Sequence, residues 1–366
     1  MQLKMTITER LLFPIINLLN KHMKLSSKHF YNTADFSQKE VNYLIDLALK
    51  MKKGQFKKSL PGKSLAMLFF NPSLRTRLSF FMAMEKLGGV GLDFPIKEGY
   101  TFEFEEGAIM NKKTIEHVKD AAKVISQYVN AIAIRSSDLI TTSTESVIVP
   151  TWQELKKDVV IKSFMKYASV PVINMESNVY HPCQGLGDAM TIKEKLGNPK
   201  GKKYSLVWSY HPKALPMATP NSQILAACDL GMEVVVAHPS GWELDPEILK
   251  VMEQRAKNAG GNFQIVNSQN EAFKDASVIC AKSWGALKFY GNWEEEKKLR
   301  DQHKDWIVDK EKMAKTNQAI FMHCLPVRRN VEVTDDVIDS KNSVVIDEAE
   351  NRMWAQMAII KSLLNK

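Results

Sequence analysis

The stretch FFNPSLRTR, residues 69–77, decides the fold that the sequence predicts. The apolar run LAMLFF that leads into it is typical of a buried strand ending at Phe70. Asn71 and Pro72 interrupt the strand, and a helix-compatible run, RLSFFMAMEKLG, follows from Arg77. A strand-to-helix turn of this kind offers free backbone N–H groups and the positive end of a helix dipole to an anion.

The side chains in this turn are suited to phosphate. Arg75 and Arg77 add positive charge in a fork geometry, and the hydroxyls of Ser73 and Thr76 are further donors. Taken alone, the stretch fits an exposed, charged helix start equally well. The choice between the two interpretations depends on other motifs.

Length and composition indicate a globular protein of about two domains. The chain has 366 residues, of which 45% are hydrophobic and 25% charged, with a formal net charge of +9. Outside MKKGQFKK, residues 51–58, the lysines are dispersed, and no nucleic-acid-binding motif is present. A basic balance without such a motif suits an enzyme that attracts anionic substrates.

The four cysteines, Cys183, Cys228, Cys280 and Cys324, show no CxxC or CxxH spacing. Zinc binding and a disulfide framework are therefore not expected, and a reducing compartment, the cytoplasm, is predicted. We interpret residues 1–22 as a non-catalytic helical extension, because their nine-residue apolar run is too short to span a bilayer and no cleavage site follows it. No transmembrane segment is predicted elsewhere.

Strand and helix patterns alternate along the first half of the chain. A helix over 37–53 with Ser37 as N-cap comes first. Strands are then predicted over 64–70, 89–94, 131–135 and 171–175, and helices over 77–87, 114–128 and 153–167. The polar stretch SSDLITTSTES after Arg135 is expected to be a loop. This alternation favours a parallel sheet with helices on both faces.

A second alternating series begins at residue 204. Strands are predicted over 204–208, 232–239, 262–266, 277–281, 318–322 and 343–346, and helices over 221–231, 246–259 and 269–274. The predicted fold class is α/β, with two doubly wound parallel-sheet domains joined by interdomain helices. The expected division is an extension (1–22), a first domain (23–175), a second domain (176–347) and a C-terminal helix (348–366) that packs back on the first domain.

Three further motifs follow predicted strands or begin helices: HPCQ at 181–184, HCLPVRRN at 323–330 and DEAENR at 347–352. His181 can donate to a carbonyl oxygen and Gln184 can read an amide, although a lone histidine is more often structural. Cys324 lacks a local base, so its segment is interpreted as backbone recognition rather than as a nucleophile. Arg328 and Arg329 either add charge at the mouth of the site or form a solvated pair.

Ligands bind at the carboxyl ends of strands in open α/β sheets, and all four motifs lie at such ends. Several arginines without a catalytic acid–base pair suit a positioned transfer that involves phosphate.

In this order and spacing, SxRTR, HPCQ and HCLP resemble the aspartate/ornithine carbamoyltransferase superfamily from about Met23 to the C-terminus. More narrowly, FFNPSLRTR, PVINME, HPCQ, YHPKALP, AKSWGAL, HCLPVRRN and DEAENR resemble the N-acylornithine carbamoyltransferases of arginine biosynthesis, of the acetyl and succinyl types. Ordinary ornithine enzymes carry an acid in a DxxxSMG segment that meets the substrate α-ammonium. Here that segment reads AKSWGA with Lys282, and acylation of the substrate removes the ammonium charge.

The resemblance implies a binding site for carbamoyl phosphate. Ser73, Leu74, Arg75 and Thr76 would hold the phosphate, and Arg352 would complete that site. Arg135, His181 and Thr76 would polarise the carbonyl oxygen. Gln184 and the backbone at Cys324 and Leu325 would take the amide. The residues implied as catalytic are Arg75, Thr76, Arg135 and His181.

The resemblance also implies a site for the acylornithine, whose neutral δ-amine attacks the carbonyl carbon. Its expected contacts are Glu176, Lys282 at the α-carboxylate, Leu325 and Ile115. No metal or organic cofactor is expected. The family is trimeric, and a loop of the neighbouring subunit that includes Tyr100 would close each site.

Three positions depart from the family pattern. Acetylornithine enzymes usually have Trp where Tyr100 aligns, and Tyr keeps a flat face. They have Glu at the position of Ile115, where succinylornithine enzymes have Pro; Glu would repel the distal carboxylate of a succinyl group, and Ile would not. Glu332 stands where acetyl-type relatives can carry a carboxylated lysine, so that modification is predicted to be absent. Acetyl and succinyl specificity both stay open.

Three alternatives stand beside this interpretation. The chain can be a carbamoyltransferase for another amine, because Tyr100 and Ile115 both affect the acceptor side. It can be a non-catalytic paralogue that binds carbamoyl phosphate, although the complete set of Arg75, Arg135 and His181 argues against that. A nucleic-acid-binding protein is disfavoured by the dispersed charge.

Overall fold

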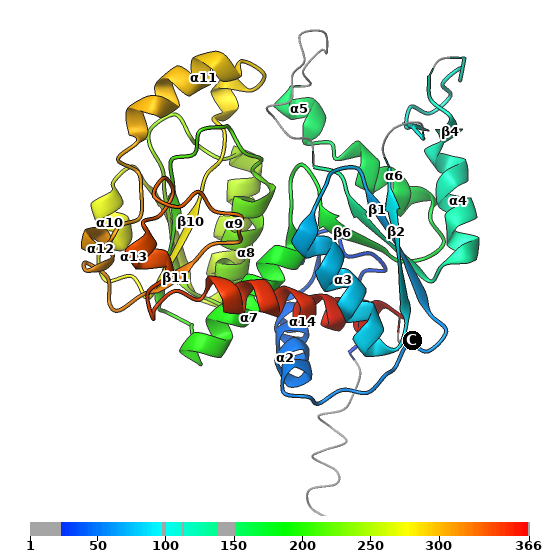
Figure 1. Ribbon diagram of the computed structural model, residues 1–366, viewed down its shortest axis with the longest axis horizontal. Helices are drawn as coiled ribbons and strands as arrows, with labels where there is room; N and C mark the ends of the chain where they lie inside the picture. Colours follow the sequence, from blue (N-terminus) through cyan, green and yellow to red (C-terminus); the bar gives the residue numbers. More distant parts are fainter. Residues whose placement is uncertain (1–22, 97–99, 112, 138–150, 365–366) are drawn as a thin grey trace, which may run out of the picture.

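A computed structural model describes residues 23–96, 100–111, 113–137 and 151–364. It has two parallel β-sheets side by side, one from each half of the chain, with helices packed around both (Figure 1). Between them run two long helices, α7 (Pro182–Leu196) and α14 (Val345–Leu364). The predicted α/β class with two doubly wound parallel sheets is confirmed.

The first sheet has the strand order β2-β1-β5-β6, and all neighbouring pairs are parallel. β1, β5 and β6 are almost wholly buried because helices cover both of their faces, whereas the edge strand β2 is exposed. Its elements are β1 (Ser64–Phe69), α3 (Leu74–Leu87), β2 (Val90–Pro95), α4 (Val118–Tyr128), β5 (Ala131–Arg135), α5 (Trp152–Leu155), α6 (Val159–Tyr167) and β6 (Val172–Glu176).

The second sheet has the strand order β11-β10-β7-β8-β9, again parallel throughout. Its strands are β7 (Lys203–Trp208), β8 (Glu233–Ala237), β9 (Asn262–Val266), β10 (Val278–Lys282) and β11 (Ile320–Met322). The helices among them are α8 (Ala218–Asp229), α9 (Pro246–Ala259), α10 (Gln269–Phe273), η2 (Leu287–Phe289), α11 (Trp293–Arg300), η3 (Asp301–His303) and α12 (Lys310–Met313). After β11 comes α13 (Asp335–Ile338).

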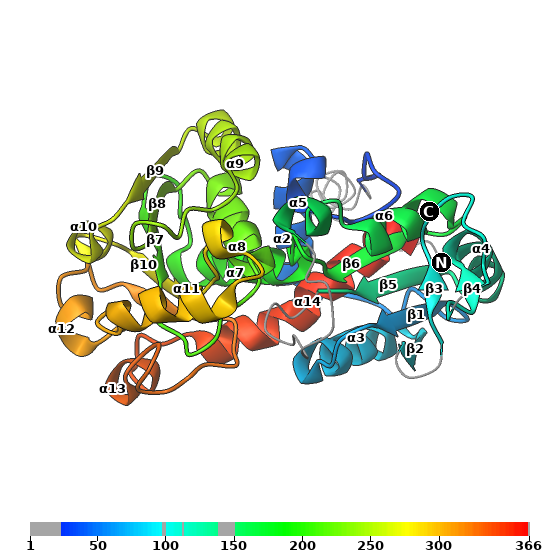
Figure 2. The same ribbon diagram turned by 90° about the horizontal axis from the view of Figure 1, so that it is seen from above.

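The C-terminal helix joins the two halves. α14 packs against α7, α3 and the early helix α2 (Gln38–Lys52), and Figure 2 shows it running from the second half across to the first sheet. The predicted return of this helix to the first domain is confirmed. α2 follows a short helix, η1 (Thr33–Asp35), and begins at a capping box between Ser37 and Glu40.

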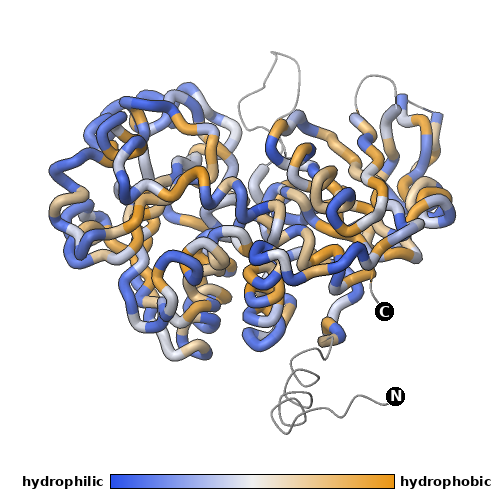
Figure 3. Tube along the Cα trace, turned by 60° about the horizontal axis from the view of Figure 1, so that its bottom comes forward, coloured by the Kyte–Doolittle hydropathy of each residue, from blue (hydrophilic) through white to orange (hydrophobic). Residues whose placement is uncertain are grey.

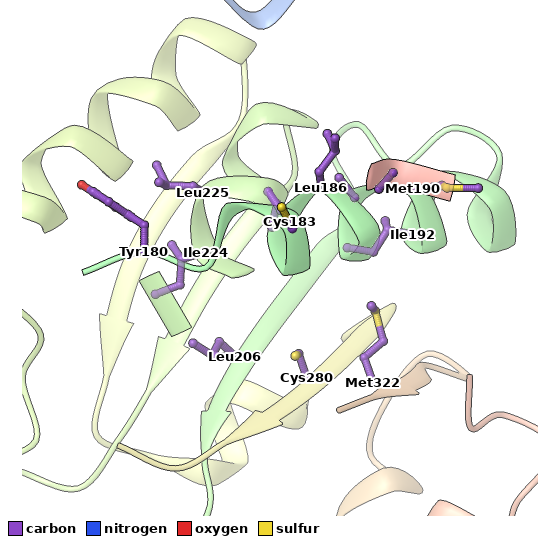
Figure 4. Close-up of a cluster of buried hydrophobic side chains, with 14 of the residues drawn as sticks. Tyr180, Cys183, Leu186, Met190, Ile192, Leu206, Ile224, Leu225, Cys280 and Met322 are labelled. Carbon is purple, nitrogen blue, oxygen red and sulfur yellow. The ribbon is translucent and has the colours of Figure 1, made fainter. Parts of the chain in front are cut away.

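The apolar core of the second half forms where α7 lies over the second sheet. Cys183, Leu186 and Met190 of α7 come together with Leu206, Cys280 and Met322 from three strands, and Ile224 and Leu225 of α8 join them (Figure 4). Apolar segments run through the interior of this half, while hydrophilic stretches predominate around its rim (Figure 3). This packing fixes the start of α7, and with it His181, against the strand ends.

Most predicted elements are present within a residue or two of their predicted bounds. The strands 131–135 and 262–266 and the helix 246–259 match β5, β9 and α9. The predicted N-cap Ser37 accepts the Glu40 N–H. These segments combine strong periodicity with clear cap or turn residues, and tertiary packing does not override them.

Three predicted helices have other bounds in the structure. The helix expected from Arg77 begins at Leu74, because Ser73 caps it. The helix expected over 114–128 begins at Val118, because β4 (Glu116–His117) pairs with β3 (Phe102–Glu103). The helix expected over 153–167 is divided into α5 and α6 at Asp158, where φ is +48°.

The strand expected over 343–346 is also wrong, and the last helix starts earlier than residue 348. Ser343 forms only an isolated bridge with Phe321, and α14 begins at Val345. The bridge is made by the Phe321 N–H to the Asn342 oxygen and the Val344 N–H to the Phe321 oxygen, so pairing stops after one residue. The helix then takes over.

Residues 1–22 and most of the predicted loop after Arg135 lie outside the described residues. The domain bounds stay predictions: every strand of the first sheet ends by Glu176, and every strand of the second begins after it. No helix among the described residues is both long and apolar enough to cross a membrane.

Candidate active site

The predicted site residues come from both halves of the chain and meet around the starts of α3 and α7. Ser73, Leu74, Arg75 and Thr76 form the start of α3, Arg135 and Glu176 end β5 and β6, and His181 and Gln184 open α7. Lys282 ends β10, Cys324 and Leu325 follow β11, and Arg352 lies in α14. Strand ends and helix starts supply all but one of them, as expected for open parallel sheets.

The start of α3 is arranged to receive an anion. Ser73 Oγ accepts the Thr76 N–H at 3.3 Å, so the backbone N–H groups of Leu74 and Arg75 remain at the open end of the helix. Leu74 contributes only its backbone, because its side chain is 71% exposed. The anion site at this turn stays a prediction, and the open helix start is the feature on which it rests.

Arg77 does not join this group, contrary to the prediction that it adds charge beside Arg75. Its guanidinium lies 4.5 Å from the centroid of the Phe69 ring and 3.3 Å from the Asp93 carboxylate. The reason is helical geometry: two residues apart on α3, Arg75 and Arg77 point to different sides.

α14 brings a buried arginine to the start of α3. Arg352 is 3% exposed, and its Nη2 donates to Thr76 Oγ1 at 2.8 Å. Burial lowers the pKa of Arg352, and Arg135 contributes to that lowering. The Nε atoms of Arg75, Arg135 and Arg352 are buried and lack a hydrogen-bond partner within the part of the chain that the structure describes. Three guanidinium groups thus retain buried N–H donors without a partner, as binding of an oxyanion requires.

His181 lies among these cations and is neutral. Its backbone N–H donates to Ser222 Oγ at 2.8 Å, and its Nε2 lies 3.5 Å from Glu176 Oε2. Burial, followed by the positive charges of Arg352 and Arg135, holds the pKa of His181 well below its ordinary value of 6.5. A neutral imidazole of this kind can donate one hydrogen bond to a carbonyl oxygen.

Glu176 forms an ion pair with Arg135 at the ends of two adjacent strands. It is 8% exposed and is the only carboxylate within 4 Å of the three guanidinium groups, among the described residues. The cluster therefore retains excess positive charge.

Two glycines of HPCQGLGD allow the helices to approach closely enough to build this cluster. A Cβ on Gly185 would lie 2.5 Å from the Ser222 carbonyl oxygen, and a Cβ on Gly187 would lie 3.2 Å from Arg352 Cγ. α7 therefore touches α8 on one side and α14 on the other, and this contact places His181 next to Arg352.

Lys282 and Glu332 are two further charged residues near this cluster, and each affects the pKa of the other. Lys282 is 8% exposed; burial opposes its charge, but interactions with Cys324 and with the carboxylates of Glu332 and Glu176 raise its pKa above the ordinary value. Glu332 accepts the Arg328 N–H at 2.7 Å and lies 3.5 Å from His323 Nε2. Burial opposes ionisation of Glu332, but these contacts and Lys282 lower its pKa to about 2. Both groups are charged at neutral pH.

The HCLP segment presents its backbone rather than a reactive thiol. Burial raises the pKa of Cys324 to about 11, so the thiol stays protonated. The Leu325 N–H donates to His323 Nδ1 at 3.0 Å, and φ of Leu325 is +52°. Because the Leu325 N–H is already hydrogen-bonded, this segment can offer its carbonyl oxygens to a ligand.

Tyr100 and Ile115 are not brought to this cluster within one chain. They are 47% and 53% exposed, and they flank the β3–β4 pair, which lies at the outer end of the first half in Figure 1. The Tyr100 hydroxyl contacts Glu116, and the Ile115 N–H donates to the Thr101 oxygen at 2.9 Å.

Sequence reasoning missed two buried acids of the site. Asp188 and Glu348 both accept from the Gln184 side chain, at 2.7 and 3.1 Å. Asp188 lies one helical turn after Gln184, and this i, i+4 spacing was the available signal. Glu348 gives no such signal, because it reaches Gln184 from a helix 164 residues away.

The described residues contain no group of three or more His, Cys, Asp or Glu side chains placed to hold a metal ion.

Comparison with known proteins agrees with this geometry. Residues 28–194 match the family model for the carbamoyl-P binding domain of aspartate/ornithine carbamoyltransferase, and residues 217–363 match the model for its Asp/Orn binding domain.

Among curated relatives, N-acetylornithine carbamoyltransferase of Xanthomonas campestris pv. campestris is 43% identical over 346 residues, 93% of this chain and 99% of the relative. Ornithine carbamoyltransferase of Thermococcus kodakarensis is 39% identical over 337 residues, 89% and 93% of the two chains.

Among solved structures, acetylornithine transcarbamylase complexed with acetylcitrulline has a TM-score of 0.88 at 42% identity, covering 93% of this chain and all of that one. A glutamate-to-alanine mutant of N-acetyl-L-ornithine transcarbamylase, complexed with carbamyl phosphate and N-succinyl-L-norvaline, has a TM-score of 0.87 at 43% identity, covering 92% and 100%.

Proposed function

The chain belongs to the aspartate/ornithine carbamoyltransferase family, and we propose how its own residues perform the reaction. It is a carbamoyltransferase that moves the carbamoyl group of carbamoyl phosphate to the δ-amine of an N-acylornithine in arginine biosynthesis. The products are an N-acylcitrulline and phosphate.

One observation carries the proposal: three guanidinium groups meet a helix start and a neutral histidine, and Glu176 is their only ion-pair partner among the described residues. Such an excess of charge, held by the fold before a ligand arrives, suits a phosphate dianion. A structural ion-pair network would instead balance its charges internally.

The phosphate is proposed to lie at the start of α3, against the N–H groups of Leu74 and Arg75, the Ser73 hydroxyl and the guanidinium groups of Arg75 and Arg352. In this position the helix dipole and the charges act together on the group that leaves. Arg135, His181 and Thr76 then lie on the side where the carbonyl oxygen gains negative charge.

The transfer itself needs positioning and electrostatic stabilisation. The neutral δ-amine attacks the carbonyl carbon, a C–N bond forms, and a tetrahedral intermediate places its negative charge on the oxygen facing Arg135 and His181. The C–O bond to phosphate then breaks, and the amine proton passes to the leaving phosphate. Gln184 and the carbonyl oxygens at Cys324 and Leu325 hold the carbamoyl NH₂ group.

On the acceptor side, Lys282 is proposed to bind the α-carboxylate and Glu176 to contact the acylornithine backbone. Lys282 is suited to this role because its pKa is raised and it keeps its charge although it is buried. No acid is proposed for an α-ammonium, since an acyl group has removed that charge.

Ile115 is proposed to be the position that decides between an acetyl and a succinyl group on the acceptor. A relative in which a glutamate is replaced by alanine was solved with a succinyl ligand. An apolar Ile115 would likewise leave a succinyl carboxylate without a repelling charge.

A homotrimer is proposed, in which Tyr100 and Ile115 of one subunit complete the site of the next. The support is an exposed apolar strip on α3 and β2, formed by Leu74, Leu78, Phe81, Val90 and Phe94 with exposed fractions of 47–71%. An apolar strip on an edge strand and its neighbouring helix is typical of a subunit contact. Analytical ultracentrifugation of wild type and Phe81→Lys tests it.

A cytoplasmic location is proposed as well. All four cysteines are free thiols, and three of them are buried, as suits a reducing compartment.

Product identification tests the function. Incubation of the full chain with ¹³C-labelled carbamoyl phosphate and N-acetylornithine or N-succinylornithine should move the label into a ureido carbon, with equimolar phosphate release. Absence of transfer to either acceptor, in protein that still binds carbamoyl phosphate, would support the non-catalytic alternative. Transfer only to a different amine would support the other-amine alternative.

A further inference from the structure

We propose that Asp188 and Glu348 are positioning residues that fix the side-chain amide of Gln184, so that its oxygen faces the NH₂ group of the carbamoyl donor. The inference rests on the proposed function and deepens it. It assigns a role to two buried acids, one on α7 and one on α14, that the proposed substrate contacts leave unused, and it explains how the enzyme tells an amide from a group of similar shape.

The geometry leaves Gln184 one orientation. Its Nε2 donates to Asp188 Oδ1 at 2.7 Å and to Glu348 Oε1 at 3.1 Å. All three residues are buried, with at most 1% exposure. A primary amide nitrogen has two hydrogens, and two carboxyl groups occupy both of them.

The amide oxygen is therefore the atom that Gln184 can offer to a ligand. Among the described residues, no hydrogen-bond donor reaches Gln184 Oε1. The NH₂ group of carbamoyl phosphate has donors only, so it requires an acceptor. A reversed Gln184 would set two NH₂ groups against each other and leave buried donors unpaired.

Glu348 also holds the backbone segment that is proposed to contact the carbamoyl NH₂ group together with Gln184. Its Oε2 accepts the backbone N–H of His323 at 2.8 Å, and His323 Nδ1 in turn accepts the Leu325 N–H at 3.0 Å. One carboxyl group on α14 thus holds both Gln184 and the segment whose carbonyl oxygens are proposed to meet the carbamoyl NH₂. Both of its oxygens act as acceptors.

The charge state of the pair permits this role. Burial raises the pKa of Asp188 to about 6, and burial together with Asp188 raises the pKa of Glu348 well above its ordinary value. With a pKa of about 6, Asp188 is mostly ionised at neutral pH. An ionised carboxylate 2.7 Å from Gln184 can only accept, which excludes the reversed amide.

Glu348→Gln breaks the pattern with almost no change of shape. The new amide has one oxygen for two donors, the His323 N–H and Gln184 Nε2. If its oxygen stays with His323, its NH₂ faces Gln184 Nε2, so one of these buried donors is left unpaired and Asp188 alone holds the orientation of Gln184. Asp188→Asn is the matched control, because the asparagine makes the same carboxyl-to-amide change in the same buried cluster and keeps an oxygen for Gln184.

The readout is discrimination between two stable ligands, measured by calorimetry on the full chain. Phosphonoacetamide carries the NH₂ group, and 2-oxopropylphosphonate carries a methyl group in its place. Inorganic phosphate reports on the anion site alone. A ligand NH₂ group that finds an acceptor binds roughly tenfold or more tightly than one that is left unpaired.

We expect wild type and Asp188→Asn to prefer phosphonoacetamide, and Glu348→Gln to lose most of that preference with unchanged phosphate affinity. If Glu348→Gln is insoluble, Glu348→Met, which removes both acceptors without adding a donor, should also reduce the preference. An unchanged preference in the Glu348 variants, or an equal loss in Asp188→Asn, would overturn the positioning role. Failure of wild type to bind phosphonoacetamide would overturn the proposed function and this inference together.

Discussion

The donor side and the acceptor side of the site balance their charges differently. On the donor side, Arg75, Arg135 and Arg352 share one paired carboxylate, Glu176, and the neutral His181 adds no charge. On the acceptor side, the cation Lys282 lies near the ionised Glu332. The first side carries a surplus of positive charge and the second is close to neutral.

This difference matches the charges of the two proposed substrates. Carbamoyl phosphate is a dianion, whereas N-acetylornithine has one carboxylate and one δ-ammonium and no net charge. A preformed positive site stabilises the leaving phosphate without reorganisation, and a neutral acceptor site allows the δ-amine to lose its proton without a strong field. The charge asymmetry of the site thus supports the proposed side for each substrate.

The largest effect is expected from removing charge on the donor side. Arg75→Ala should lower kcat/KM by about 10² to 10³, because it removes a charge-assisted contact to the leaving phosphate. Arg77→Ala is the matched control on the same helix and should change the rate little, since Arg77 pairs with Asp93 and stacks on Phe69. Initial rates for both variants check this, and near-normal turnover of Arg75→Ala would remove the donor-side assignment.

On the acceptor side, Lys282→Met should weaken binding of the acylornithine and leave binding of the carbamoyl donor unchanged. The expected rise in KM for the acylornithine is about 10- to 100-fold, the cost of losing a charged hydrogen bond to its carboxylate. Affinity for phosphonoacetamide should stay within a few-fold of wild type. A loss confined to the donor ligand would reverse the assignment of the two sides.

The balanced pair also predicts a stability effect. Contacts in the folded state lower the pKa of Glu332 from 4.5 to about 2, so its contribution is present above pH 4.5 and is lost as the pH falls toward 2. Glu332→Gln should lower the free energy of unfolding by on the order of 3 kcal/mol at neutral pH. Urea unfolding of wild type and Glu332→Gln from pH 7 down to pH 4 should show that the difference in their free energies of unfolding becomes smaller at the acid end. A difference that does not change with pH would contradict a stabilising role for the Glu332 charge.

The smallest effect on activity is expected from substitution of Ile115, because this residue is proposed to affect only the choice of acyl group. Ile115→Glu should lower kcat/KM for N-succinylornithine by roughly tenfold through like-charge repulsion, and should leave N-acetylornithine nearly unchanged. Ile109→Glu, at a position 82% exposed, is the charge-matched control. Equal losses with both substrates would show that Ile115 does not contact the acyl group.

The sequence allowed much of the donor side to be predicted, because its residues lie in short motifs at strand ends. FFNPSLRTR placed Ser73, Arg75 and Thr76 at a strand-to-helix turn, and HPCQ placed His181 and Gln184 at another. Local chemistry, the cap and the proline, determines both places. Arg77 was assigned wrongly because its partner, Asp93, comes from the neighbouring strand.

Contacts between distant elements could not be predicted in this way. Nothing local indicates that Arg352 reaches Thr76 or that Glu348 reaches Gln184, because both pairs depend on how α14 crosses α3 and α7. The same holds for the balance between Lys282 and Glu332, which lie on segments 50 residues apart. The strand predicted at 343–346 is absent for a related reason. Ser343 forms one bridge with Phe321, and α14 then begins at Val345.

The most direct test of the charge asymmetry compares acceptors with and without an α-ammonium group. Initial rates with carbamoyl phosphate would be measured in parallel for ornithine, N-acetylornithine and N-succinylornithine. We expect turnover of at least one acylated substrate well above that of ornithine, because the proposed place of Lys282 beside the substrate α-carbon would repel an α-ammonium. A preference for ornithine would contradict the neutral acceptor side and the role given to Lys282.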